Sequence, residues 1–399
     1  MRSLTCLATA AVTAIGLVTG CDSASPEPMA SATTVSTATL GSSGTASSAA
    51  SAAAAPTGCG AEQLSRMSVR QKLGQLIVVG VTGTDDALSL VGSEPVGGIF
   101  VGSWTDKSIL SGNNLRRLNQ QSDVPLMVTV DQEGGRVSRL SSLGIDSPSA
   151  RELAQSSTPA QVRQLAERIG RQLKAKGITV DYAPVLDVSD EADDEVIGDR
   201  SFGNDPQQVT EFAQAFAQGL QAAGIVPVFK HFPGHGHGSG DSHLGVVRTP
   251  PLSQLERSDL VPYHTVLQNP GNAAVMVGHL IVPGLTAGNT PASLSRRAIQ
   301  MLRTGNAPDG HPYGGAPFNG VIFSDDLSGM GAITQRYPLP EAVLRFLQAG
   351  GDIALWISTD AVSSVLDTLQ RAVRNRKLSE TAVNDSVVRV LRTKGVLRC

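Results

Sequence analysis

The chain has 399 residues, 41% of them hydrophobic, and its 32 basic and 35 acidic side chains give a formal net charge of −3. A chain of this length buries a full hydrophobic core without help from metals or many disulfides. The near balance of charge leaves no positive footprint for nucleic acid, so we expect no nucleic-acid binding.

The N-terminus has the pattern of a targeting segment. Arg2 supplies a short positive region, and residues 4–18 are almost wholly apolar or small. Such a run, roughly 15 residues, is too short to span a bilayer comfortably but fits a signal peptide. The segment ends in Val-Thr-Gly-Cys at Cys21, which resembles the lipobox of bacterial lipoproteins. The resemblance implies a signal over residues 1–20, acylation of Cys21 and a lipid anchor on the extracytoplasmic side of the membrane. The alternative is an ordinary secretory signal in which Cys21 is incidental.

Residues 22–58 are dominated by Ser, Ala and Thr. Such a segment buries too little apolar surface to offset its ordering entropy. We therefore expect residues 21–58 to form an acylated, disordered tether that carries a catalytic domain over residues 59–399.

Four cysteines occur in the chain. Cys6 lies in the signal and Cys21 is the expected lipid site, which leaves Cys59 and Cys399 at the two ends of the globular region. An oxidising exterior permits a disulfide between them, which we favour over two unpaired thiols.

Short β-branched runs alternate with segments of helical periodicity, such as residues 159–176, 206–223, 339–349 and 380–392. Eight such units predict an α/β fold with a single (β/α)8 barrel of the TIM type. The candidate strands are residues 76–81, 97–102, 126–131, 180–187, 225–231, 273–279, 321–325 and 352–357.

Polar residues end five of these strands. In a barrel of this type the C-terminal strand ends carry the active site, so we expect the polar side chains to meet at one mouth. Asp187 and His279 are expected either to line the pocket or to support it from behind. The strand-end residues are Asp131, Asp187, Lys230 with His231, His279 and Asp325.

A Gly-rich segment follows the fifth candidate strand and predicts a mobile loop above the mouth. In it Asp241 and His243 are two residues apart, so an extended backbone places both side chains on one side. A carboxylate beside an imidazole favours the charged ring, which suits a proton donor. The four histidines of this region could instead suggest zinc. Their irregular spacing and the lack of a rigid ligand platform argue against it, and we expect no metal and no cofactor.

The second motif is Val-Ile-Phe-Ser-Asp-Asp-Leu-Ser over residues 321–328. Adjacent carboxylates at a strand end point to opposite faces, so only Asp325 is expected to face the mouth. We expect Asp326 to cap the following helix.

Together with Val-Asp-Gln-Glu-Gly-Gly-Arg-Val-Ser-Arg over residues 130–139, these motifs identify a family. From about residue 60 to the C-terminus the chain resembles family 3 glycoside hydrolases of the β-N-acetylglucosaminidase type, in their actinobacterial lipoprotein form. The resemblance implies that Asp325 is the nucleophile and His243 the acid/base, with Asp241 as its partner. It assigns binding of the N-acetylglucosamine ring to five residues: Asp131, Arg139, Arg200, Lys230 and His231.

The implied activity is retaining, exo-acting release of terminal β-linked N-acetylglucosamine (GlcNAc) by a monomer, without metal. An extracytoplasmic location points to peptidoglycan fragments that contain GlcNAc linked to N-acetylmuramic acid (MurNAc). One alternative is a phosphorylase, because a neutral histidine repels phosphate less than a carboxylate would. Another is a cell-wall-binding lipoprotein without catalysis, although no implied catalytic residue is missing.

Two residues and one segment near the motifs carry further expectations. Glu133 is expected to pair with Arg136 rather than touch substrate, and Trp104 either to stack on a sugar or to serve packing. Residues 328–331 read Ser-Gly-Met-Gly where relatives have Ser-Met-Glu-Gly, so contacts beyond the first sugar are expected to differ.

Overall fold

The structure is a computed structural model and describes residues 58–399. The predicted signal over residues 1–20, the predicted lipid site Cys21 and nearly all of the predicted tether lie outside the described residues. No helix within residues 58–399 is long and apolar enough to cross a membrane.

Eight parallel strands close into a barrel, in the order β1-β12-β11-β9-β7-β6-β3-β2. The predicted fold class is therefore confirmed, and each candidate strand coincides with one barrel strand, although β7 and β11 each end one residue beyond the predicted range. Most strand residues are buried, as expected for parallel strands covered on both faces. The strands are β1 (Ile77–Gly80), β2 (Gly98–Val101), β3 (Met127–Val130), β6 (Val180–Asp181), β7 (Val226–Phe232), β9 (Ala274–Val277), β11 (Ile322–Asp326) and β12 (Ile353–Trp356).

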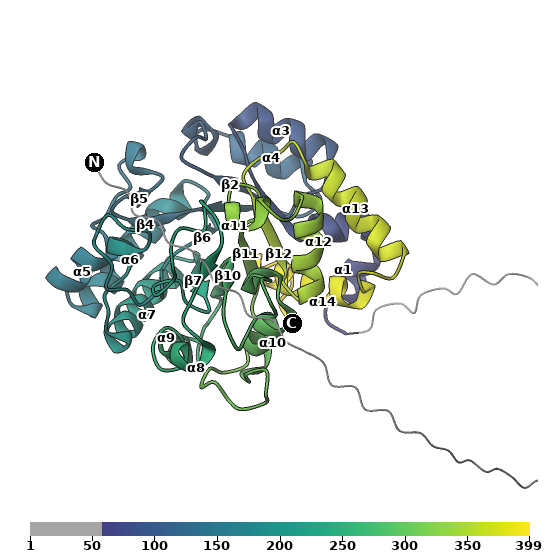
Figure 1. Ribbon diagram of the computed structural model, residues 1–399. Coiled ribbons are helices and arrows are strands. Elements are labelled where there is room, and N and C mark those ends of the chain that lie inside the picture. Colours follow the sequence, from purple (N-terminus) through teal and green to yellow (C-terminus); the bar gives the residue numbers. More distant parts are fainter. Residues whose placement is uncertain (1–57) are drawn as a thin grey trace, which may run out of the picture. The chain divides into compact units, whose positions relative to one another are not determined.

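Helices surround the barrel (Figure 1). The two longest, α6 and α7, pack against each other, and each begins with proline after a capping side chain, Thr158 or Asp205. At the other side of the ring α13 and α14 both pack on α2. The helices are α1 (Ala61–Ser65), α2 (Val69–Gly74), α3 (Thr84–Ser93), α4 (Asn114–Gln121), α5 (Ala150–Ser156), α6 (Pro159–Ala175), α7 (Pro206–Ala222), α8 (Leu252–Leu255), α9 (Val261–Val266), α10 (Arg296–Thr304), α11 (Gly331–Thr334), α12 (Leu339–Ala349), α13 (Val362–Arg374) and α14 (Glu380–Thr393).

Three features differ from the sequence prediction. β6 ends at Asp181 rather than residue 187, and only an isolated bridge from Val185 to Lys230 continues the pairing. Pro184 lacks the backbone N–H that a continuous ladder needs there. Two small pairs were not predicted: the hairpin of β4 (Gln132–Gly134) with β5 (Val137–Ser138), and β8 (Val247–Arg248) beside β10 (Leu280–Ile281).

A disulfide joins Cys59 to Cys399, with their Cα atoms 5.8 Å apart. The predicted pairing is confirmed. It closes a loop with a sequence separation of 340 residues. In the chain-entropy description so long a loop corresponds to a stabilisation of about 6 kcal/mol for an unstrained bridge.

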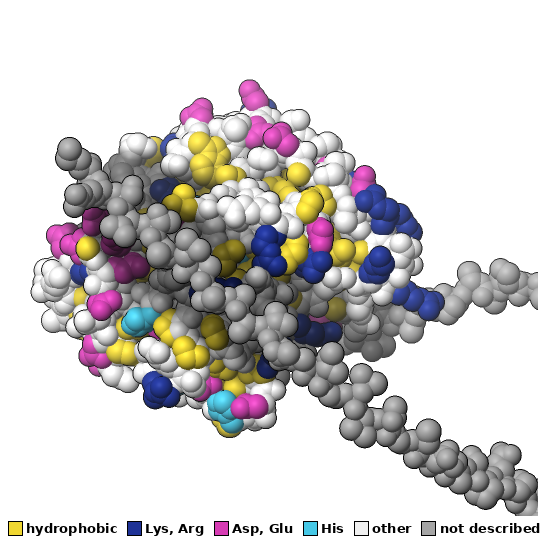
Figure 2. Space-filling model, in the orientation of Figure 1, with side chains coloured by type: hydrophobic (Ala, Val, Ile, Leu, Met, Phe, Trp, Pro, Cys, Tyr) yellow, Lys and Arg dark blue, Asp and Glu magenta, His cyan; other side chains and the backbone are white. Residues whose placement is uncertain are grey.

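The described surface carries both signs of charge. Figure 2 shows acidic and basic side chains on the same visible face, with hydrophobic side chains scattered among them. Scattered apolar side chains of this kind are ordinary for a folded domain.

Candidate active site

A cavity of about 730 Å³ lies at the C-terminal ends of the barrel strands. Its size falls in the usual range for small-molecule sites. All of the globular residues that the sequence singled out for catalysis or sugar binding line it: Asp131, Arg139, Arg200, Lys230, His231, Asp241, His243 and Asp325. These residues come from five separate stretches of the chain, which only the closed barrel brings together.

Asp325 is the penultimate residue of β11 and lines this cavity. Burial alone would raise the pKa of its carboxyl group. The charges of His231 and His279 and the backbone N–H of Asp326 outweigh the burial and hold the pKa at about 2. The side chain is therefore a carboxylate at any pH near neutrality, as a nucleophile requires.

His243 lies on the Gly-rich loop, residues 234–245, between β7 and β8. Its ring nitrogen Nδ1 lies 2.8 Å from a carboxylate oxygen of Asp241, which also accepts the backbone N–H of His243 at 2.8 Å. Burial raises the pKa of Asp241, but the hydrogen bonds from His243 outweigh it and lower that pKa overall. The predicted pair therefore forms, with the second ring nitrogen of His243 left available.

The end of the Gly-rich loop is attached to the segment that follows Asp325. The backbone N–H groups of Gly331 and Ala332 donate to the carbonyl oxygens of His243 and Ser242, each at 3.0 Å. The side-chain amide of Gln335 donates to the Leu244 carbonyl oxygen at 3.0 Å. One short stretch of chain thus positions both predicted catalytic residues.

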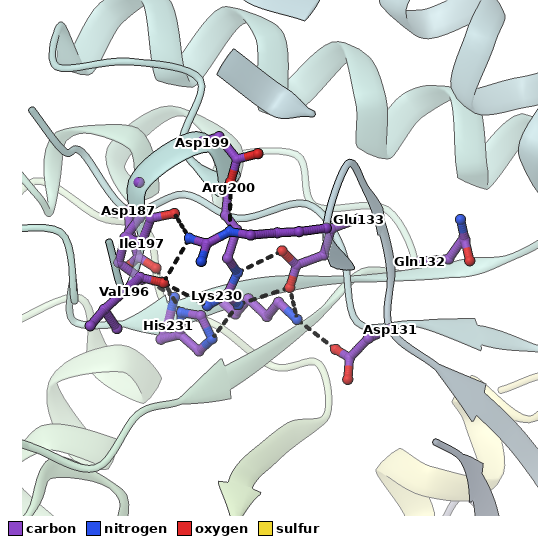
Figure 3. A network of polar contacts seen from close by, with 12 residues as sticks. Asp131, Gln132, Glu133, Asp187, Val196, Ile197, Asp199, Arg200, Lys230 and His231 are labelled. Carbon is purple, nitrogen blue, oxygen red and sulfur yellow. Dashed lines mark hydrogen bonds and ion pairs between the residues drawn. The ribbon is translucent and has the colours of Figure 1, made fainter. Parts of the chain in front are cut away.

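The floor of the cavity is an ion network centred on Glu133 (Figure 3). The guanidinium of Arg200 donates to both carboxylate oxygens of Glu133, at 2.8 and 2.9 Å. The Lys230 ammonium lies 2.5 Å from the same carboxylate and 2.7 Å from Asp131. Burial lowers the pKa of Lys230, but Asp131 and Glu133 outweigh this and raise it, so the ammonium stays charged.

Asp131 and Arg139 lie on either side of the β4–β5 hairpin. Asp131 gives one carboxylate oxygen to Lys230. Arg139 lines the cavity, and its guanidinium makes no hydrogen bond or ion pair within residues 58–399. Both therefore have hydrogen-bonding capacity to offer a ligand.

His231 is fixed by Asp187 from behind the cavity wall. Nδ1 of His231 lies 2.6 Å from one carboxylate oxygen of Asp187, whose other oxygen accepts the backbone N–H groups of His231 and His235. Asp187 is fully buried and is not among the cavity-lining residues. Asp187 was expected either to line the pocket or to support it from behind, and the structure shows that it supports the pocket from behind.

His279 also supports the site from behind the cavity wall. Its ring nitrogens contact the hydroxyl of Ser293 at 2.7 Å and the carbonyl oxygen of Asp326 at 2.8 Å. It is buried and does not line the cavity. The ring therefore braces the end of β11, on which Asp325 lies.

Two expectations were wrong. Glu133 does not pair with Arg136, because the cations of Arg200 and Lys230 take both of its oxygens, while Arg136 pairs with Asp199 at 2.7 Å. Asp326 caps no helix. Its carboxylate accepts from the backbone N–H groups of Ser328 and Gly329 and so closes a turn before α11.

Three of the four histidines of the Gly-rich region each have an aspartate partner of their own. His231, His237 and His243 pair with Asp187, Asp259 and Asp241, respectively. Among the described residues no group of three or more His, Cys, Asp or Glu side chains is placed to hold a metal ion.

Sequence reasoning missed the central place of Glu133 and the attachment of the Gly-rich loop at Gly331. The place of Glu133 could have been suspected from the sequence, because Glu133 lies only two residues after the strand-end residue Asp131. The attachment at Gly331 could not, because a backbone contact between residues 88 positions apart has no sequence pattern.

Comparisons with known proteins identify the family of the chain. Residues 68–393 match the family described as the glycosyl hydrolase family 3 N terminal domain. Beta-hexosaminidase LpqI of Mycobacterium tuberculosis is 57% identical over 331 residues, covering 82% of this chain and 83% of that protein. The solved structure of LpqI superposes with a TM-score of 0.81 at 55% identity, covering 86% of this chain and 98% of that one. A family 3 β-N-acetylglucosaminidase from Paenibacillus matches with a TM-score of 0.75 at 30% identity, over 82% of this chain and 62% of that one. The chain therefore belongs to glycosyl hydrolase family 3, in its β-hexosaminidase branch, as its motifs predict.

Proposed function

We propose that the protein is a retaining exo-β-N-acetylglucosaminidase that releases terminal GlcNAc from peptidoglycan fragments such as GlcNAc-MurNAc, in cell-wall turnover. One observation carries this proposal. A half-buried, ionised Asp325 and the Asp241–His243 pair line the same cavity and come from different elements.

In the first step a carboxylate oxygen of Asp325 attacks the anomeric carbon, and the bond from that carbon to the leaving oxygen breaks. The electron pair goes to the leaving oxygen, which takes the proton of His243. In the second step water gives a proton to the neutral His243 and attacks the anomeric carbon, which frees Asp325. Asp241 orients the ring and stabilises its charged form.

The closed, charged floor of the cavity supports exo action. Lys230, Arg200 and Asp131 offer donors and acceptors suited to the hydroxyls and acetamide of one terminal sugar. The ion pairs that these side chains make with one another and with Glu133 occupy the floor of the cavity, so we expect room there for one terminal sugar.

Phosphorolysis is a second candidate, favoured by one observation. The acid/base candidate is an imidazole, which is neutral after proton transfer and so admits an anion beside Asp325 better than a glutamate would. Phosphate would then replace water in the second step and yield the sugar 1-phosphate.

Product analysis on GlcNAc-MurNAc, with and without inorganic phosphate, tests the proposal. Proton NMR at early times should show GlcNAc of the β configuration as the first product. A 5-fluoro glycosyl fluoride of the same sugar should label wild-type protein at Asp325, and Asp325→Asn should remain unlabelled. First appearance of the α anomer, or labelling elsewhere, would contradict the retaining assignment, and sugar 1-phosphate would select phosphorolysis.

The lipid anchor through Cys21 is part of the same proposal and needs its own test. The wild-type protein should fractionate with membranes, and Cys21→Ala should not. Retention of the Cys21→Ala protein on the membrane would count against acylation as the anchor.

A further inference from the structure

Trp104 is one of only four large hydrophobic residues that are exposed within residues 58–399, and 45% of its surface is accessible. It follows β2 and lines the same cavity as Asp325 and His243. An exposed indole at a cavity mouth costs hydrophobic free energy unless something covers it.

The indole is held in a fixed position. Its six-membered ring lies directly over Gly102, where a Cβ would meet the ring atoms at 2.4–2.6 Å. The edge of Phe100 packs against it, with 5.8 Å between the ring centroids. Only a residue without a side chain fits beneath the ring. Gly102 therefore lies against one face of the indole and leaves the rest of the indole accessible.

Polar contacts stiffen the same turn. The Lys107 ammonium donates to the carbonyl oxygens of Gly102 and Thr105, at 2.8 and 2.6 Å. The Thr105 hydroxyl donates to the Val81 carbonyl oxygen at 2.6 Å and accepts the Gly102 N–H at 3.0 Å. A ring held this firmly loses little side-chain entropy when a ligand covers it.

The place of Trp104 in the cavity indicates which part of a substrate it meets. The terminal sugar belongs at the floor of the cavity, beside Asp325 and the buried Lys230. His243 must reach the leaving oxygen, so the group that leaves extends toward the mouth. Leu244, next to His243 and 78% exposed, also lines the cavity.

We infer that Trp104 is a stacking platform for the aglycone, and that the aglycone it selects is a second pyranose ring. The apolar face of the pyranose lies on the exposed indole, in the manner of ring stacking at carbohydrate sites. This inference rests on the proposed function and names the substrate class that the open end of the cavity takes.

The test compares two substrates that share the terminal sugar. One is a β-1,4-linked disaccharide of GlcNAc, and the other is the β-fluoride of GlcNAc, whose leaving group is a single atom. Trp104→Ala should lower kcat/KM at least tenfold for the disaccharide and less than twofold for the fluoride. Trp104→Phe, which keeps an aromatic face, should recover part of the loss. Val396→Ala, at an exposed hydrophobic residue that does not line the cavity, should change neither.

A binding measurement gives an independent readout. The chain has two tryptophans, and Trp356 is fully buried. In the Asp325→Asn protein, disaccharide should shift the emission of Trp104 to shorter wavelength, whereas free GlcNAc should not.

Equal losses on both substrates, or a shift with free GlcNAc, would place Trp104 at the first sugar and overturn the inference. Unchanged kinetics of Trp104→Ala on the disaccharide would also overturn it while leaving the proposed function intact. Failure of the wild-type protein to hydrolyse either substrate would instead refute the proposed function, and the inference with it.

Discussion

The backbone N–H of Gly331 donates to the carbonyl oxygen of His243 at 3.0 Å. This contact ties the loop that carries the predicted acid/base to the chain six residues after the predicted nucleophile. A Cβ at Gly331 would lie 2.9 Å from that carbonyl oxygen and 2.9–3.0 Å from backbone atoms of Leu244. The approach therefore requires glycine at this position.

Gly331→Ala should push the Gly-rich loop off its contact and lower kcat/KM about tenfold or more, since small misplacements of catalytic groups are costly. Gly245→Ala is the matched control, because its Cβ would meet nothing nearer than 3.9 Å. The loss of kcat/KM in Gly245→Ala should stay within about threefold, as expected for backbone stiffening alone. Comparable losses in the two variants, measured on one disaccharide substrate, would show that the contact at Gly331 is unimportant.

His243→Ala should lower the hydrolysis of a disaccharide by about 10²–10⁴-fold, since an alkoxide leaves poorly without a proton. An aryl glycoside with a dinitrophenolate leaving group should lose far less in its first step. His311→Ala is the control, because His311 also lies two residues after an aspartate that its Nδ1 contacts, but away from the cavity. Steady-state rates on both substrates decide the matter. An equal loss on both substrates would remove His243 from the acid role.

Glu133→Gln should destabilise the fold by about 3–5 kcal/mol, because it leaves the buried Lys230 and the half-buried Arg200 without their shared carboxylate. Glu341→Gln breaks an exposed pair with Arg345 and should cost less than about 1 kcal/mol. Chemical denaturation of both variants measures the difference. A loss in Glu133→Gln as small as that in Glu341→Gln would mean that solvent compensates the network.

Lys394 should make the stability of the fold depend on pH. It is half-buried and donates to the buried Gln75 side chain at 2.6 Å, and burial lowers its pKa to about 7. In the unfolded chain a lysine keeps its proton to about pH 10.4. Between pH 7 and 10 the unfolded state therefore binds more protons, so the free energy of unfolding should rise with pH across that window.

Lys394→Met should flatten this rise, whereas Lys377→Met, at an exposed position, should keep it. Urea unfolding at several pH values between 6 and 10 measures the slopes. A wild-type free energy of unfolding that falls from pH 7 to 10 would contradict the assignment to Lys394.

The sequence determined the barrel and the members of the site. Apolar runs that end in Asp131, Lys230 or Asp325 follow from local patterning, because every strand of a parallel barrel delivers its C-terminal residue to the same end. The partners of these residues could not be predicted in the same way. Glu133 lies near Arg136 in the chain yet pairs with Arg200 and Lys230, because burial removes the water that would otherwise satisfy those cations.

The two Asp-x-His pairs also separate what the sequence determines from what the tertiary structure decides. Asp241 with His243 and Asp309 with His311 have the same spacing, and each histidine contacts its own aspartate. Local sequence alone, without the family motif around residue 241, gives no means of telling them apart. Only the closure of the barrel and the contact at Gly331 place the first pair in the cavity with Asp325 and leave the second outside it, because these contacts join residues that are distant in the chain.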